Sequence, residues 1–262
     1  MKDYNLKILS NKQVSERYWH MILDSNDIKE PINPGQFFNI KSTDNKTFYP
    51  LLRRPFSIYL NKKKTLEFLY KVEGAGTQEL STFKTGDNIN ILGPAGVPFS
   101  IPVNTKKILL LARGVGIATL AALAQKSAQI GLEVYAVLSA RKKDDLLATE
   151  TMERFCKKII YVTEEEKTSD VSNVRCTVQE LFNKHNIDAA YTCGSKRLSK
   201  MLQKETNNHD IYSEVALEEY MACGIGVCYS CVCDVKKNGK IHTVKSCEDG
   251  PVFSLEEVIL ND

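Results

Sequence analysis

The sequence predicts a multidomain β + α/β protein, with an antiparallel β unit, a doubly wound parallel sheet and a small cysteine-rich module in that order. Three observations predict this class. Residues 1–102 contain short β-forming runs separated by turns, and residues 103–209 alternate apolar runs with helical segments. Residues 210–262 hold five of the eight cysteines. A chain of 262 residues is long enough for two or three such units.

The pattern of the first unit is typical of a small barrel or sandwich. Turn signals rich in Gly, Pro, Asn and Lys separate or follow its strands, and no long amphipathic helix is expected among them. The expected strands are "QFFNIKS", "FSIYL" and "TLEFLYKVEG", and the expected turns are "NPGQ", "NKKK", "KTGD" and "GPAGVP".

The second unit begins after Pro102 with an uninterrupted apolar run, which predicts a strand buried on both faces. An Ala- and Leu-rich helix follows a glycine turn and ends at Gly131, and a later helix has Thr177 as its expected cap. The expected strands are "KKILLLA", "LEVYAVLSA", "KKIIYVTE" and "AAYTCG", and the expected helices are "IATLAALAQKSAQIG", "TVQELFNKHN" and "SKRLSKMLQKE".

Composition and charge exclude several classes of partner. The net charge of +3 is too small to indicate a nucleic acid or an anionic membrane surface. The first residues lack the apolar region of a signal peptide, and no apolar run reaches the length of a transmembrane helix. We therefore expect a cytoplasmic protein, in which clustered thiols stay reduced and serve metal binding or redox chemistry.

The stretch "MACGIGVCYSCVCD" (221–234), with a later cysteine, is the strongest chemical signal. Its spacing C-x4-C-x2-C followed by a distant Cys is the leading pattern of a plant-type [2Fe–2S] site. We expect Gly224 and Gly226 to bring backbone N–H groups close to the sulfur atoms. The expected ligands are Cys223, Cys228, Cys231 and Cys247.

Other interpretations of these thiols stay open. Structural zinc is second, because zinc sites usually take two closely spaced cysteine pairs and only Cys247 follows the loop. A disulfide is third, given the compartment. Cys233 is expected to be a bystander on the next strand, with exchange for Cys231 as a ligand as the minority option. The isolated cysteines Cys156, Cys176 and Cys193 are most simply small apolar residues.

Two further motifs carry a family resemblance. "RRPFSIYL" (53–60) followed by "YKVEGAGTQEL" (70–80) resembles the FAD domain of the ferredoxin–NADP reductase superfamily. With "MACGIGVCYSC" and "CEDGPVF", nearly the whole chain resembles the electron-transfer subunits of dihydroorotate dehydrogenase B. The resemblance implies a six-stranded FAD-binding barrel (1–102), an NAD-binding-like α/β domain (103–209) and a [2Fe–2S] domain (210–262).

The resemblance also implies roles for residues of the barrel. Arg54 would pair with the FAD pyrophosphate, and Ser57 would form a hydrogen bond near flavin N5. Either motif alone is an ordinary edge strand or turn, so their combination carries the interpretation. The remaining expected FAD contacts are Pro55, Phe56, Leu69, Tyr70, Lys71, Gly74, Gly76 and Thr77.

The nicotinamide motif departs from the family pattern. "LARGVGIATL" (111–120) retains Gly114 and Gly116 but has Arg113 and Thr119 where a glycine and a proline are usual. The later motif retains Cys193 and Gly194, with Ser195 in place of proline. Retained NAD(H) binding is favoured, whereas altered nucleotide choice and loss of binding stay open. Arg141 and Lys142 are a solvated pair or a contact for a ribose or 2′-phosphate.

The expected function is an electron relay in pyrimidine biosynthesis. NAD(H) would exchange a hydride with FAD, and the [2Fe–2S] cluster would carry single electrons to or from an FMN-containing catalytic subunit in a heterotetramer. No residue of this chain is expected to act as a catalytic acid or base. The alternatives are an electron-transfer subunit of a sulfide dehydrogenase or a ferredoxin:NADP oxidoreductase, or a zinc-stabilised binding protein without redox chemistry.

Overall fold

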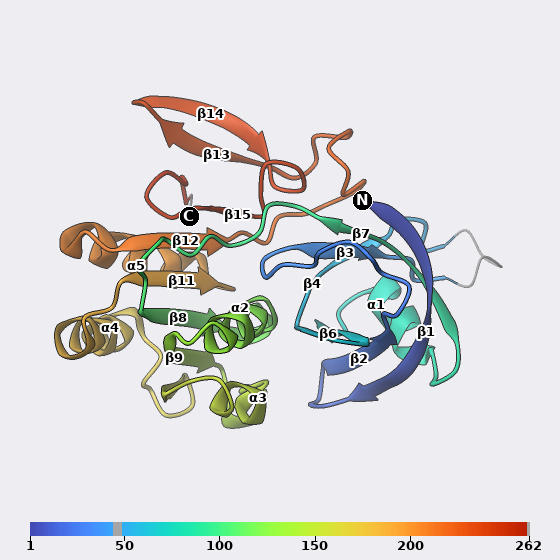
Figure 1. The fold of residues 1–262 in the computed structure, drawn as a ribbon, viewed down its shortest axis with the longest axis horizontal. Coiled ribbons are helices and arrows are strands. Elements are labelled where there is room, and N and C mark those ends of the chain that lie inside the picture. The colour runs from blue at the N-terminus through green and yellow to red at the C-terminus, as the bar shows by residue number, and fades with distance from the viewer. Residues whose placement is uncertain (44–48, 261–262) are drawn as a thin grey trace.

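The computed structural model describes residues 1–43 and 49–260. Among these residues, seven strands form one antiparallel sheet, shown in blue to green in Figure 1. The resemblance implies six strands, one fewer than this sheet contains. In pairing order the strands are β4 (Arg54–Ser57), β3 (Phe37–Ile40), β7 (Asn88–Ala95), β1 (Lys2–Gln13), β2 (Tyr18–Asp24), β6 (Thr65–Lys71) and β5 (Leu60–Lys62).

This first sheet is strongly curled. β4 lies at one edge and β6 next to the other edge, yet the rings of Phe56 on β4 and Tyr70 on β6 stack with their centroids 5.2 Å apart. The concave side encloses a core whose fully buried members include Met21, Phe38 and Phe68. The curl therefore brings the two motif-bearing strands face to face.

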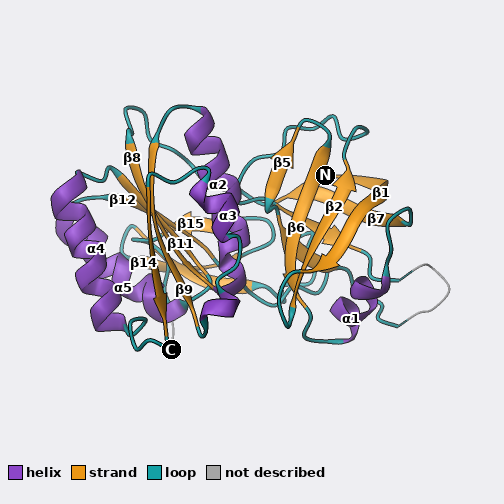
Figure 2. Ribbon diagram, turned by 90° about the horizontal axis from the view of Figure 1, so that it is seen from below, coloured by secondary structure: helices purple, strands orange, loops and turns teal. Residues whose placement is uncertain are grey.

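A short helix that the sequence analysis does not anticipate, α1 (Ala75–Thr82), follows β6 and lies at one end of the curled sheet (Figure 2). Its Leu80 is buried in the core of the sheet. The Asn11 side chain of β1 donates to the carbonyl oxygens of Leu80 and Phe83 at 2.9 and 3.1 Å. These bonds fix the helix that begins in the expected glycine turn.

The second sheet is parallel except for its last strand. Among the described residues it has six strands, and residues of β8 alternate between two cores, with Leu110 in one and Leu111 in the other. Both faces are therefore buried, which explains the uninterrupted apolar run. In pairing order the strands are β10 (Lys158–Thr163), β9 (Glu133–Ala140), β8 (Lys107–Arg113), β11 (Ala189–Cys193), β12 (Tyr212–Ala216) and the antiparallel β15 (Val252–Ser254).

Helices cover the two faces of this sheet (Figures 1 and 2). The first core holds residues of α2 and α3, and the second holds residues of α4 and α5. The bounds are η1 (Gly114–Gly116), α2 (Ile117–Gln129), η2 (Lys143–Asp145), α3 (Thr149–Glu153), α4 (Val171–His185) and α5 (Lys196–His209). No helix within the described ranges is long and apolar enough to cross a membrane.

The expected cap at Thr177 is wrong. α4 begins earlier, because the Asp170 side chain accepts a hydrogen bond from the Asn173 N–H at 3.0 Å and caps the first turn. Thr177 lies in the second turn, where its hydroxyl donates to the Asn173 carbonyl oxygen at 3.0 Å. A hydroxyl inside a helix makes the same kind of local bond that marks a helix start, so the sequence pattern misleads here.

The cysteine-bearing segment lies against both sheets. It runs from β12 through the hairpin β13 (Val232–Lys237) and β14 (Lys240–Lys245) to β15, so β12 and β15 tie it to the parallel sheet. On the other side, the Val97 N–H after β7 donates to the Gly250 carbonyl oxygen at 2.5 Å. The module expected at 210–262 is thus anchored at both ends.

Candidate functional site

A cavity of about 650 Å³ opens where the curled sheet meets the parallel sheet and the cysteine segment. Its volume is in the range of pockets that hold organic ligands. Phe37, Val115 and Met221 line it from three different parts of the chain. Seven of the expected FAD contacts also line it: Arg54, Pro55, Phe56, Ser57, Leu69, Tyr70 and Lys71.

Gly76 lies directly against Arg54. A Cβ built on Gly76 would come within 2.3 Å of Arg54 Nε and 2.6 Å of Nη2, so only a bare Cα fits beneath the guanidinium group. The "RPFS" and "GAGT" motifs therefore form one surface. Gly74 has open space around it, so no neighbouring atom would exclude a side chain at this position.

The Thr77 hydroxyl is used inside the turn. It accepts hydrogen bonds from the backbone N–H groups of Glu73 and Gly74 at 2.9 and 3.1 Å. Thr77 therefore shapes the start of α1, whereas Arg54 and Gly76 present the charged surface at the cavity. A guanidinium on a backbone without side chains suits a diphosphate.

A second cavity, of about 460 Å³, lies at the carboxyl ends of β8 and β9. Such crevices at the carboxyl ends of parallel strands are where open α/β sheets bind ligands. Gly114 and Gly194 line it, and so do the basic side chains of Arg113, Arg141 and Lys142. The two cavities share four lining residues: Lys71, Glu73, Val115 and Glu218.

Gly116 packs without lining either cavity. A Cβ on Gly116 would come within 2.6 Å of the Cys193 carbonyl group, and a Cβ on Gly194 (φ +95°) within 2.1 Å of the Arg113 carbonyl oxygen. The two glycine motifs therefore bring the ends of β8 and β11 into backbone contact. Here the retained glycines serve close packing beside the second cavity.

Arg113 is held by its own domain. Its guanidinium forms an ion pair with Glu164 after β10 and donates to Ser139 Oγ on β9 at 2.6 Å. Its side chain is only 15% exposed, which shows that the arginine does not simply extend into solvent. Ser195, the other departure from the family pattern, caps α5 by accepting from the Leu198 N–H at 3.4 Å.

The expected cluster cysteines meet in two pairs. The thiols of Cys223 and Cys228 interact, and so do those of Cys231 and Cys247. Within the described ranges, no group of three or more His, Cys, Asp or Glu is arranged to hold a single metal ion. A [2Fe–2S] rhomb takes four cysteines across two irons, so two thiol pairs fit that group.

Backbone N–H groups point at these sulfur atoms. The Gly226 N–H donates to Cys247 Sγ at 3.2 Å, and the Cys247 N–H donates to Cys231 Sγ at 3.4 Å. The Gly226 N–H thus approaches a sulfur atom as expected, and Gly224 and Gly226 have φ of +65° and +82°, in the left-handed region that favours glycine. Such N–H groups stabilise thiolates and sulfides and influence the reduction potential of a cluster.

The pKa values of Cys223 and Cys247 are shifted in opposite directions. Burial opposes ionisation of Cys223, but hydrogen bonds from the backbone N–H groups of Ile225, Cys228 and Val227 outweigh it and lower its pKa to about 6. Burial, followed by the hydrogen bond with the Cys231 thiol, raises the pKa of Cys247 to about 12. The Cys223 thiol therefore ionises more readily than the Cys247 thiol.

Lys245 braces the same loop. Its Nζ donates to the Gly226 carbonyl oxygen at 3.0 Å, lies 4.9 Å from the centre of the Tyr229 ring and pairs with Glu248. Cys233 instead lies in β13 opposite Val244 and packs against the second core of the parallel sheet. This position agrees with the interpretation of Cys233 as a bystander.

The first cavity and the cysteine loop share a wall. Phe37 and Met221 line the cavity, and both pack against the buried cysteines Cys231 and Cys247. The first cavity and the cysteine loop, which come from distant parts of the sequence, are thus separated by the side chains of Phe37 and Met221.

The sequence analysis misses several residues at this junction. Phe37, Glu218 and Met221 line the first cavity without belonging to a recognised motif. Glu218 reaches solvent through the cavity but is surrounded mostly by protein, and this burial raises its pKa. The Cys193 thiol lies 3.8 Å from its Oε1. The position of "LEEYM" directly before the cysteine loop is the available signal for these residues.

The fold and the site together define the ferredoxin–NADP reductase-like class of flavoproteins. A solved structure of an NADH-dependent reduced ferredoxin–NADP oxidoreductase matches with a TM-score of 0.80 and 27% identity, over 97% of this chain and 90% of the other. Ferredoxin–NADP+ reductase from Plasmodium falciparum matches with a TM-score of 0.65 and 17% identity, over 84% and 97%. The latter shows the fold alone.

Within this class, the curated relatives identify the family. The model of the iron–sulfur cluster binding domain of dihydroorotate dehydrogenase B matches residues 218–259. Electron transfer subunits of dihydroorotate dehydrogenase B (NAD(+)) are 33% identical in Desulforamulus reducens, over 98% of each chain, and 36% identical in Caldanaerobacter subterraneus, over 97% of each chain. The chain belongs to the family of dihydroorotate dehydrogenase B electron transfer subunits.

Proposed function

We propose that this chain is the electron-transfer subunit of a dihydroorotate dehydrogenase of the NAD-linked type, and hence an oxidoreductase subunit of pyrimidine biosynthesis. It relays electrons between a catalytic partner subunit and NAD(H) through a [2Fe–2S] cluster and FAD. The observation that carries this proposal is the wall formed by Phe37 and Met221 between the cavity and the cysteine loop. When bound, the flavin supplies hydride exchange with nicotinamide and single-electron exchange with the cluster.

The residues of the first cavity bind and orient the flavin. Arg54 over Gly76 holds the pyrophosphate, and Pro55, Phe56 and Ser57 face the ring system from β4. Leu69, Tyr70 and Lys71 form the opposite wall on β6, while Gly74 and Thr77 set the turn that starts α1. The stacking of Phe56 on Tyr70 keeps the two walls at a fixed separation.

The cysteine loop holds the cluster. Cys223, Cys228, Cys231 and Cys247 would hold the cluster through their thiolates, and the N–H groups of the loop would stabilise the thiolate charge. The buried pair lies toward the flavin cavity, whereas Cys228 is exposed. When bound, the cluster would supply single-electron exchange with the partner from the side on which Cys228 is exposed.

The second cavity binds NAD(H). Gly114 and Gly194 line it, while Gly116 and Cys193 hold the two strand ends together beside it. Because Val115 and Glu218 line both cavities, a nicotinamide ring bound in the second cavity would lie close to a flavin bound in the first. Arg113, whose guanidinium is held by Glu164 and Ser139, contributes a fixed positive group to the lining of this cavity.

The three units act as an FAD-binding barrel (1–102), a doubly wound NAD-binding domain (103–209) and a [2Fe–2S] domain (210–262) whose strands β12 and β15 extend the parallel sheet of the second unit. The partner is an FMN-containing catalytic subunit, with two copies of each subunit in a cytoplasmic heterotetramer. The names of the relatives, which specify an electron transfer subunit, support a partner of this kind.

Anaerobic purification tests the proposal. The protein should be reddish-brown, with flavin absorbance and stoichiometric iron and acid-labile sulfide. Cys223→Ser and Cys228→Ser should abolish or shift the visible spectrum of the cluster, whereas Cys176→Ser, on the exposed face of α4, should leave it unchanged.

Two results would contradict the proposal. A colourless protein that contains zinc would show that the loop is a structural metal site without redox chemistry. An unchanged cluster spectrum in Cys223→Ser would show that the thiol pairs are not the ligands.

A further inference from the structure

We propose that Asn39, a residue of the flavin-side sheet, is the positioning residue that holds the cluster loop against that sheet; this inference rests on the function proposed above. Asn39 lies in β3 and is only 2% exposed. Its Nδ2 donates to the Gly224 carbonyl oxygen at 3.1 Å, across 185 residues of sequence. A buried side-chain amide that binds one carbonyl of a cysteine loop fixes that loop in place.

The contact is shaped from both sides. A Cβ on Gly224 would come within 2.3 Å of Asn39 Oδ1 and 2.6 Å of Nδ2, so the glycine lies flat against the amide. Gly224 also has φ of +65°, which an L side chain adopts only with strain. The glycine that begins the turn after Cys223 is therefore matched to the amide on the opposite sheet.

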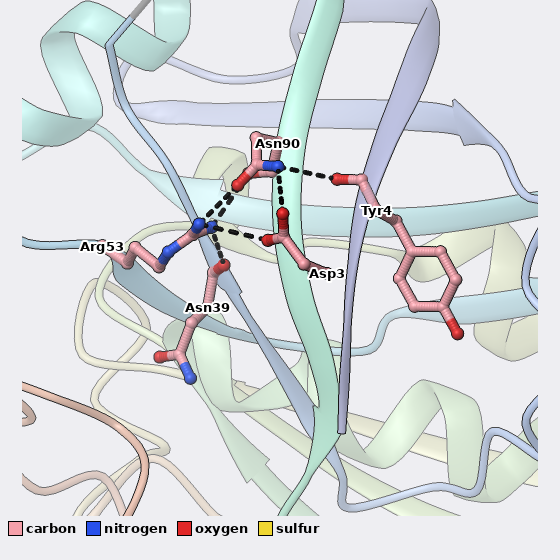
Figure 3. Close-up of polar contacts among 5 residues, drawn as sticks. All are labelled: Asp3, Tyr4, Asn39, Arg53 and Asn90. Atoms are coloured by element: carbon pink, nitrogen blue, oxygen red, sulfur yellow. Dashed lines mark hydrogen bonds and ion pairs between the residues drawn. The ribbon is translucent and has the colours of Figure 1, made fainter. Parts of the chain in front are cut away.

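Asn39 is itself held by a polar network, shown in Figure 3. Arg53 Nη1 donates to the Asn39 carbonyl oxygen at 3.3 Å, and its Nη2 donates to Asp3 Oδ1 at 3.2 Å and to the Asn90 side chain. Asn90 Nδ2 in turn donates to Asp3 Oδ2 at 3.0 Å and to the Tyr4 carbonyl oxygen at 3.2 Å. Through Arg53, which directly precedes β4, the backbone of Asn39 is thus tied to residues of β1 and β7.

Phe37 and Asn39 act from the same face of β3. Side chains two positions apart in a strand point to one side, and Phe37 packs against Cys231 and Cys247 while Asn39 binds Gly224. One strand of the flavin-side sheet therefore contacts both halves of the cysteine loop. Asn39 supplies the hydrogen bond that fixes the position of the cysteine loop on β3, whereas Phe37 supplies apolar packing.

The test compares Asn39→Ala with the isosteric Asn39→Asp in the purified holoprotein. Hydrogen exchange of the 222–227 amides should rise about tenfold in Asn39→Ala, the equivalent of one lost buried hydrogen bond. Asn39→Asp should open the loop at least as much, because a carboxylate cannot donate to the Gly224 carbonyl. A residue that only fills space would give the opposite order, since Asp keeps the volume of Asn.

Spectroscopy gives the second readout. Both Asn39 variants should retain FAD and iron but show a broadened or shifted electron paramagnetic resonance signal of the reduced cluster. Asn11→Ala and Asn11→Asp are the controls, because Asn11 makes the same kind of bond to the carbonyl oxygens of Leu80 and Phe83 at the end of α1. They should leave the cluster signal and the exchange of residues 222–227 unchanged.

A double-mutant cycle distinguishes a specific contact between Asn39 and Gly224 from general misfolding of the variants. Gly224→Ala alone should disturb the cluster signal, and combining it with Asn39→Ala should restore part of that loss, because the overlapping amide is gone. Strictly additive effects, or exchange and spectra identical to the unmodified protein in both Asn39 variants, would overturn the role of Asn39. If the unmodified protein itself lacks iron and sulfide, the proposed function fails instead, so the two failures are distinguishable.

Discussion

At the proposed flavin site, the close approach of atoms limits individual residues as much as charge does. The approach of Arg54 to the bare Cα of Gly76 leaves no space for a methyl group. A side chain there would push the guanidinium group out of line with the cavity. Gly74, two residues earlier, has extended backbone at φ −146° and no neighbour within 4 Å of an added Cβ.

We predict that Gly76→Ala loses FAD, because its Cβ displaces Arg54 from the pyrophosphate position. The FAD-to-protein ratio after gel filtration should fall several-fold, the effect of weakening one bidentate charged contact by about 1–2 kcal/mol. Gly74→Ala is the matched control and should retain FAD. Full flavin occupancy in Gly76→Ala would remove Arg54 from the pyrophosphate site.

Short motifs make some of these residues predictable and leave others hidden. Arg54 and the four cysteines occur in patterns whose spacing carries chemical meaning. Asn39 and Glu218 occur in no such pattern, because each acquires its role from a neighbour that only the tertiary fold provides. The bond from Asn39 to Gly224 spans 185 residues, and no local spacing encodes it.

At the level of elements, periodicity predicts the parallel domain well. The run "KKILLLA" becomes β8, and the Ala- and Leu-rich segment becomes α2, followed by Gly131 at φ +83°. α1 is missed because it is short and starts inside a glycine turn. The "GPAGVP" segment, expected as a turn, contributes Gly93 to Ala95 to β7, because pairing with β1 and β3 outweighs the local preference for a turn.

A buried carboxylate joins three strands of the first sheet. Glu67 on β6 has a side chain only 3% exposed, and it contacts His20 Nε2 on β2 at 2.9 Å and Lys62 Nζ on β5 at 2.6 Å. Burial favours its protonated form, but hydrogen bonds from His20 and Lys62 outweigh it and lower the pKa of Glu67. Since the folded pKa is depressed, this stabilisation is present above pH 4.5, the ordinary value, and is lost as pH falls through the folded pKa.

We predict that Glu67→Gln lowers the free energy of unfolding by about 2 kcal/mol at pH 7, because two charge-assisted hydrogen bonds are weakened. The difference from the unmodified protein should shrink as the pH falls below 4.5, where the native carboxylate also becomes protonated. The fluorescence of Trp19, the single tryptophan, reports this element during urea unfolding, because Trp19 lies in β2. Equal destabilisation by Glu67→Gln at pH 7 and below pH 4.5 would contradict this role. So would a similar loss of unfolding free energy in the exposed control Glu79→Gln.

At the scale of the whole molecule, the two cavities and the cysteine loop adjoin one another. Val115, in the helical turn η1 after β8, lines both cavities, and Phe37 lies between the first cavity and the buried cysteines. No single domain contains all three sites. They adjoin only because the two sheets and the cysteine segment pack together.

We predict that Val115→Phe blocks the opening between the two cavities. The flavin should remain bound, but anaerobic bleaching by NADH should slow by about tenfold or more, because the nicotinamide no longer reaches a reactive position. Stopped-flow absorbance measures the rate, and Val115→Ala should react like the unmodified protein. Bleaching of Val115→Phe at the unmodified rate would place the nicotinamide on another route.

The joint between Asn39 and Gly224 has a consequence for reassembly after unfolding. Its two halves lie 185 residues apart in the sequence, so the cysteine loop gains this support only when both parts of the chain are folded together. Iron and sulfide should therefore be incorporated in vitro into the folded protein more readily than into the urea-unfolded chain. Equal rates of incorporation in the two states would refute this dependency.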